Sequence, residues 1–200
     1  LGGGFRSSTF PQAVVNPANP NQIYVIFPDK GTTPDKANIY MTTSSDGGTT
    51  WSPRVQVNDD ATTTDQFMPT VAINPAGTRL FVGYYSRQLD VNNVMIDTYC
   101  RTATLSGSTV TFDASQRVTT TSFPVVVGVD PAIVGSYMGD YDQAVADNTS
   151  YYRTWGDNRL SSTAHTNQPD VRFTKIPKAG PGAALTAGAI ALTAENCTPA

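Results

Sequence analysis

Aspartates are the residues best able to do chemistry in this 200-residue chain, and they stand in two clusters. Asp59, Asp60 and Asp65 bring oxygen ligands of the kind that Ca²⁺ prefers close together. Asp140 and Asp142 stand two residues apart, so on a regular strand they would point the same way and could act as a pair in hydrolysis. The alternative for both clusters is solvated carboxylates and turn caps. We expect that no cofactor is required and that Ca²⁺ is the ion these residues could hold.

Arginines and aromatic residues form a second set that could bind an anionic or sugar ligand. Arg87 and Arg159 follow aromatic runs at corresponding places, and Asp157 stands two residues before Arg159. Tyr84 and Trp155 could offer flat faces for stacking against a sugar or a cation. The alternative is that Asp157 and Arg159 form an internal ion pair and that the aromatic rings belong to the core.

Histidine and cysteine offer little further chemistry. His165 is the one histidine, and it lies in a polar stretch without a Ser and Asp motif at triad spacing, so we expect an exposed loop residue. Cys100 and Cys197 could form one disulfide or remain two buried thiols, and the sequence leaves both open. A zinc site built from Cys and His is not expected.

The composition restricts the partners and the location. Charged residues make up 14% of the chain and the formal net charge is -3, so there is no basic stripe for a phosphate backbone and we expect no nucleic-acid partner. No apolar run approaches the roughly 20 residues of a membrane-spanning helix, so we expect no membrane span. Few lysines and many Thr, Ser and Asn residues are typical of secreted β-proteins, which indicates a periplasmic, extracellular or cell-surface location.

Short runs of β-branched and aromatic residues, bounded by turn residues, dominate the chain. The clearest three runs span residues 22–27, 79–85 and 150–155. Apolar residues seldom recur at the three-and-four spacing of a helix, whereas these runs have the length and composition of strands. The sequence therefore predicts an all-β fold.

The three runs occupy corresponding places in a repeat, with a first strand before each run and a third strand after it. The first strands span residues 13–17, 71–75 and 144–148, and the third strands span residues 38–41, 93–96 and 170–173. A unit of three or four strands has the size of a propeller blade, which needs a neighbouring sheet on either side. The repeats cover approximately residues 5–62, 63–123 and 136–178, and residues 179–200 form a tail or closing strand.

Antiparallel strands place the loop after each second strand on the same face as the segment between blades. These loops span residues 28–37, 86–92 and 156–169, and the segment between the first two blades spans residues 58–68. We call this end of the molecule the rim. The rim is expected to collect most of the acidic, arginine and aromatic candidates.

One octapeptide, Ser44-Ser45-Asp46-Gly47-Gly48-Thr49-Thr50-Trp51, predicts the hairpin between the third and fourth strands of the first repeat. In it the carboxylate can accept backbone N–H bonds, the glycines can supply positive φ, and the indole can pack against the blade. The positions with a structural role are Ser44, Asp46, Gly48, Thr50 and Trp51. The second repeat carries a degenerate copy, with Gly107 in the place of the aspartate. We expect this hairpin to lie opposite the rim.

The octapeptide resembles the Asp box of the Asp-box (BNR repeat) sialidase-like β-propeller family. Further stretches are similar to bacterial secreted members, within a region of roughly residues 10–175: residues 57–60, 65–69, 139–141 and 155–159. The resemblance implies a sialidase-like β-propeller of six blades, of which this chain supplies about three. The remaining blades would come from the same chain or from a second copy.

The same resemblance implies catalytic machinery only in part. Family sialidases use an arginine triad, a Tyr–Glu nucleophile pair and an Asp acid/base. The one glutamate here is Glu195 in the tail, so the nucleophile pair is not expected within this chain. Phe5-Arg6 is similar to the motif of the first family arginine, but Ser7 and Ser8 replace its Ile-Pro. Arg6 is therefore a weak catalytic candidate, beside Asp140 and Asp142.

These observations favour a secreted sialidase-like module that binds a glycan or a protein, or has a structural role, without catalysing a reaction by itself. The alternative is a fragment of an exo-sialidase-like glycoside hydrolase whose other catalytic residues lie outside this chain.

Overall fold

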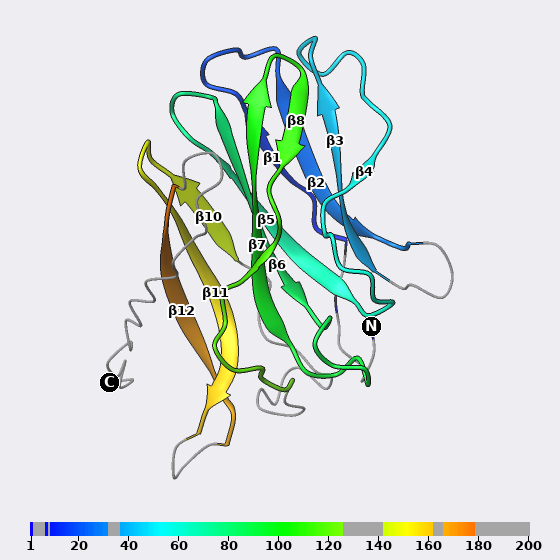
Figure 1. The fold of residues 1–200 in the computed structure, drawn as a ribbon, viewed down its shortest axis with the longest axis vertical. Helices are drawn as coiled ribbons and strands as arrows, with labels where there is room; N and C mark the ends of the chain where they lie inside the picture. The colour runs from blue at the N-terminus through cyan, green and yellow to red at the C-terminus, as the bar shows by residue number, and fades with distance from the viewer. Residues whose placement is uncertain (2–6, 8, 32–36, 126–141, 162–165, 179–200) are drawn as a thin grey trace, which may run out of the picture.

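The computed structural model describes residues 1, 7, 9–31, 37–125, 142–161 and 166–178 (Figure 1). Within these residues every regular element is a strand, and all strand pairs are antiparallel. The strands form three sheets of four, five and three strands, one for each expected repeat. The prediction of an all-β fold is confirmed.

The first sheet has the strand order β1 (Gln12–Val15), β2 (Ile23–Asp29), β3 (Asn38–Ser44), β4 (Val55–Gln56). Burial alternates along β2, because successive side chains of a strand point to opposite faces. Tyr24 and Ile26 lie on the buried face. One side of this sheet is therefore core and the other is partly open.

The second sheet lies between the other two and has the order β5 (Gln66–Ile73), β6 (Arg79–Ser86), β7 (Asp97–Ser106), β8 (Thr109–Phe112), while β9 (Gln116–Arg117) also pairs with β7. Every residue of β6 is buried, since both faces of this sheet are covered. The third strand was expected over residues 93–96, and that prediction is wrong. Asn93 has φ 57°, in a turn that precedes the strand, and β7 begins at Asp97.

The third sheet has the order β10 (Gln143–Ala146), β11 (Ser150–Leu160), β12 (Gln168–Pro177). Residues 156–169 were expected to be a rim loop, but β11 runs to Leu160 and β12 begins at Gln168. The ladder between β11 and β12 continues past Asp157, with a register shift before Leu160. Continued pairing of the backbone thus replaces both ends of the expected loop, half of its residues.

Two apolar layers hold the sheets together. The layer between the first and second sheets contains Tyr24, Ile26, Leu80, Val82 and Tyr84. The layer between the second and third sheets consists mainly of Phe81, Ala72, Cys100, Tyr151 and Ile176. The ring of Phe81 stacks on that of Tyr151, with the centroids 5.0 Å apart.

Five turns gather at one end, which we call the turn end and which lies uppermost in Figure 1: those between β1 and β2, β3 and β4, β5 and β6, β7 and β8, and β10 and β11. Hydrogen bonds connect them. The Asn16 amide donates to the Gly77 carbonyl at 3.1 Å, and the Gln22 amide donates to the Gly107 carbonyl at 2.6 Å. The backbone N–H of Gly47 donates to the Asn21 carbonyl at 3.0 Å. The octapeptide hairpin lies here, opposite the rim.

Candidate functional site

The octapeptide forms the expected hairpin, and its aspartate organises the turn. Asp46 Oδ1 accepts hydrogen bonds from the Ser44 hydroxyl at 2.8 Å and from the Thr50 backbone N–H at 2.9 Å. The Thr50 hydroxyl donates to Oδ2. Gly47 and Gly48 have φ of 72° and 93°. Hydrogen bonds from Thr50 and Ser44 lower the pKa of Asp46 to about 2, because they stabilise the ionised carboxylate.

Trp51 lies at the turn, where its indole is partly buried. Its side chain is 45% exposed, and its indole N–H donates to the Gly48 carbonyl at 3.1 Å. A Cβ at Gly48 would lie 3.8 Å from the ring, an ordinary contact, so the positive φ and not the space favours glycine at this position. The turn closes on its own tryptophan, which leaves part of the ring open to solvent.

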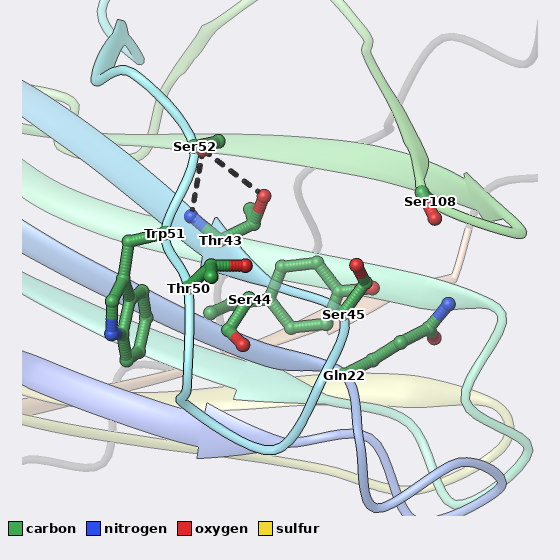
Figure 2. Close-up of a pocket in the computed structure, with 9 residues that line it drawn as sticks. Gln22, Thr43, Ser44, Ser45, Thr50, Trp51, Ser52 and Ser108 are labelled. Atoms are coloured by element: carbon green, nitrogen blue, oxygen red, sulfur yellow. Dashed lines mark hydrogen bonds between the residues drawn. The ribbon is translucent and has the colours of Figure 1, made fainter.

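Beside this turn lies a cleft of about 330 Å³ (Figure 2). Its lining residues are Gln22, Tyr24, Thr43, Ser44, Ser45, Thr50, Trp51, Ser52 and Ser108. Seven of these side chains carry a hydroxyl, one carries an amide and one is an indole; none is charged. Ser108 belongs to the turn after β7, so the cleft spans the first and second sheets.

The side chains of the cleft are held in place to different degrees. The Thr43 hydroxyl donates to the Ser52 hydroxyl at 3.2 Å, and the Ser52 hydroxyl also accepts the Thr43 backbone N–H at 3.0 Å. Ser45 and Ser108 are exposed, and their hydroxyls have no hydrogen-bond partner in the part of the chain that the structure describes. The cleft therefore combines fixed polar walls with two hydroxyls open to a ligand.

At the rim, the candidates for ligand binding contact other residues of the chain. Arg87 is buried; it contacts Asp65 at 3.4 Å and donates to the Asn93 carbonyl at 2.9 Å. Tyr84 is fully buried between the first and second sheets. Trp155 is buried in a cluster with Tyr85 and others near the rim. Neither ring presents an open face to solvent.

Asp157 and Arg159 form the internal ion pair that the sequence offered as an alternative. The Arg159 Nε–H lies 2.8 Å from each carboxylate oxygen of Asp157, and the Arg159 backbone N–H donates to Oδ1 at 2.9 Å. Asp157 is completely buried. Both residues stand on β11, so the pair stabilises the end of a strand.

The three candidate metal ligands point to separate partners. Asp59 lies 3.6 Å from Arg101 and accepts the Ser115 backbone N–H at 3.0 Å. Asp60 accepts hydrogen bonds from the Asn58, Thr62 and Gln66 side chains. Asp65 pairs with Arg87. Among the described residues there is no group of three or more His, Cys, Asp or Glu side chains that could hold a metal ion.

Asp142 belongs to a buried cluster that the sequence did not reveal. Its Oδ1 accepts the Tyr85 hydroxyl at 3.0 Å, and its Oδ2 lies 3.3 Å from Arg153. The Tyr85 hydroxyl accepts the Gly156 backbone N–H at 2.9 Å. Burial raises the pKa of Asp142, an effect that Arg153 opposes, and burial also raises the pKa of Tyr85 well above its ordinary value.

Arg153 was missed because it occupies a core position of β11. The signal in the sequence was the placement of Arg153 between Tyr151 and Trp155, on the face that packs against the second sheet. Gly83 faces it: a Cβ there would lie 2.6 Å from Arg153 Cδ. The other weak candidates, Arg6 and Asp140, lie outside the described residues, as do His165, Glu195 and Cys197. Cys100 is a buried free thiol.

No protein-family model matches this chain, and a search of curated proteins also finds no match. Within the described residues, the structure contains no helix with the length and apolar character needed to cross a membrane.

Proposed function

We propose that this chain is a secreted, non-catalytic binding module of the sialidase-like β-propeller type, and that its ligand is a glycan. The observation that carries this proposal is the contrast between the two ends of the molecule. At the rim, the two arginines expected to bind a ligand are paired with Asp65 and Asp157, whereas the turn end has an open, uncharged polar cleft beside a half-exposed indole. Polar groups on a concave surface with an aromatic face suit non-covalent binding of a sugar.

The propeller assignment is supported by equivalent residue pairs that lie on the same face of each of the three sheets. Three cross-strand pairs, Val14 with Tyr24, Ala72 with Phe81 and Val145 with Tyr152, occupy the same place in successive sheets. The first two pairs face the next sheet in the stack, and we call the corresponding side of each sheet its front.

The front of the third sheet has no neighbour among the described residues. Val145 is 61% exposed and Val171, on the same face, is 67% exposed. On the opposite side of the stack, Val15 of the first sheet is 50% exposed. Apolar side chains are thus open to solvent at both ends of the stack, as expected if further blades cover them.

A glycan array, together with a fluorogenic sialoside, tests the proposed function. We expect the 200-residue chain to retain at least one class of glycan and to release no fluorophore. Turnover that is lost in Arg159→Ala or Asp142→Asn would contradict the non-catalytic assignment and favour the glycoside-hydrolase fragment. An array without any signal would contradict the glycan ligand and leave a protein ligand or a structural role.

A further inference from the structure

We infer that the turn-end cleft is the glycan site and that it takes a neutral sugar residue, which stacks on Trp51 and hydrogen-bonds to the hydroxyls of Ser45 and Ser108. This inference rests on the proposed glycan-binding function and assigns it a place and a ligand class. It puts the site at the end of the molecule opposite the rim.

The absence of charge among the lining residues of the cleft argues for a neutral ligand. All nine side chains are uncharged, so a carboxylate or phosphate would enter without a cation to compensate the loss of its hydration. Asp46 is the ionised group of the adjoining turn, and its oxygens already accept hydrogen bonds from Ser44 and Thr50. Its negative charge, like the net charge of -3 of the chain, disfavours anions further.

The mixture of groups in the cleft favours a sugar over other neutral ligands. A sugar ring has an apolar C–H face and hydroxyls around its edge, and it needs a flat apolar surface together with many donors and acceptors. Trp51 supplies the surface, with 45% of its area exposed, and the serine and threonine hydroxyls each supply a donor and an acceptor. The volume of about 330 Å³ is near the lower limit of ligand pockets, which suits a short glycan.

The site is largely preformed, which lowers the entropy lost on binding. The indole of Trp51 is fixed through Gly48, and the side chain of Gln22 is fixed by its bond to the Gly107 carbonyl. The bond from Gln22 also ties the first sheet to the turn that carries Ser108. The two walls of the cleft are thereby held at a fixed separation, and the open hydroxyls of Ser45 and Ser108 need no rearrangement to meet a ligand.

The fluorescence of the two tryptophans allows a direct test. Trp51 is half-exposed at the cleft and Trp155 is buried near the rim, so a ligand in the cleft changes the emission of Trp51. The full chain is titrated with galactose, glucose, N-acetylglucosamine and their short oligomers, and in parallel with sialyllactose. We expect a saturable change with at least one neutral sugar, and at least tenfold weaker binding of sialyllactose.

Variants locate the site. Ser108→Tyr fills the cleft from the second sheet and is expected to weaken binding of the neutral sugar at least tenfold in calorimetry, while Thr121→Tyr, at an exposed hydroxyl residue outside the cleft, leaves it unchanged. Trp51→Ala is expected to abolish binding, and Trp51→Phe to restore part of it. The unchanged thermal unfolding of each variant, followed through Trp155, shows that the loss is not a loss of folding.

The outcomes separate this inference from the proposed function. Neutral sugars that bind equally well to Trp51→Ala and Ser108→Tyr overturn the cleft as the site and leave a glycan-binding module intact. Preferential binding of sialyllactose overturns the neutral ligand class. A chain that binds no glycan, on the array or in solution, overturns both.

Discussion

Asp46 shows how much of the turn end depends on one side chain. Its two oxygens bind the hydroxyls of Ser44 and Thr50 and the Thr50 backbone N–H, and together these contacts fix a turn whose glycines have positive φ. An ionised acceptor makes stronger hydrogen bonds than a neutral one. The shape of the neighbouring cleft thus depends on a carboxylate that does not line it.

The pH dependence of Asp46→Asn is the first prediction. The pKa of Asp46 falls from 3.8 to about 2 on folding, so its stabilising effect is complete above about pH 5 and is lost as the pH falls through the folded value. We expect Asp46→Asn to have a lower Tm than the unmodified chain at pH 6, and the difference to shrink as the pH approaches 2. Calorimetry at both pH values measures it. A difference that stays the same at pH 2 would mean that the charge is unimportant.

Asp142 and Arg153 give a second prediction, because both are buried at the contact between the second and third sheets. Removing one partner leaves the other charge buried and unpaired, which typically costs about 3–5 kcal/mol. We expect Asp142→Ala to lower the free energy of unfolding by about that amount in urea titrations. The double variant Asp142→Leu with Arg153→Met should recover much of it. A double variant that is as unstable as the single one would show that the pair itself stabilises the fold.

At the scale of elements, the second and third sheets can pack closely because one position of β6 is a glycine, Gly83. Arg153 from β11 lies against Gly83 of β6, where a Cβ would approach Cδ to 2.6 Å. Real Cβ atoms do not come that close, so a side chain at Gly83 would push the sheets apart or displace the arginine.

Gly83→Ala is therefore expected to lower the free energy of unfolding by about 1–3 kcal/mol, the usual cost of overpacking. Gly107→Ala is the matched control. It has φ 57° and nothing within 4 Å of a Cβ, so it carries backbone strain of about 1 kcal/mol without a clash. Arg153→Ala removes the clashing side chain. In that background, the loss in free energy of unfolding caused by Gly83→Ala should be smaller, whereas the loss caused by Gly107→Ala should be unchanged. A destabilisation by Gly83→Ala that is the same with and without Arg153→Ala would contradict the packing argument.

Elements with a local signal were predicted well from the sequence. The second strand of every repeat and the octapeptide hairpin depend on side chains that are neighbours in sequence, such as Ser44, Asp46 and Thr50. The extension of β11 to Leu160 depends on its pairing with β12. The composition of the segment does not predict this pairing. The cluster of Tyr85, Asp142 and Arg153 joins residues up to 68 positions apart in sequence, and no local pattern connects them. The cleft likewise needs Ser108 from the second sheet. The sequence therefore predicted the octapeptide hairpin on one side of the cleft, but not the cleft itself.

At the scale of the whole molecule, each sheet has a front and a back that differ in sequence. Tyr24 on the front of the first sheet and Phe81 on the front of the second are both covered by the next sheet, whereas Tyr152 on the front of the third is partly open. Contacts between such unlike faces are heterologous, and they lead to a ring or to an open stack. Any neighbour of the third sheet should therefore present a back face like that of the first.

Val145→Asp tests this polarity. Val145 is exposed on the front of the third sheet, so we expect the free energy of unfolding of a single chain to change by less than about 0.5 kcal/mol. Binding of a further sheet to this face, supplied by a longer chain or by a second copy, should be lost. Light scattering over a range of concentrations measures self-association, and Val91→Asp, at an exposed loop position, is the control. Association that is equally strong in Val145→Asp and in the control would exclude this face.

The buried thiol of Cys100 allows the separation of the second and third sheets to be measured as a rate. Burial raises its pKa to about 12, so at neutral pH the sulfur is both protonated and shielded from reagents. Alkylation of Cys100, identified by peptide mass mapping, can then proceed only during moments when the two sheets separate. The rate of alkylation therefore reports how often the two sheets separate. A neighbour bound on the front of the third sheet should lower this rate without contacting the sulfur.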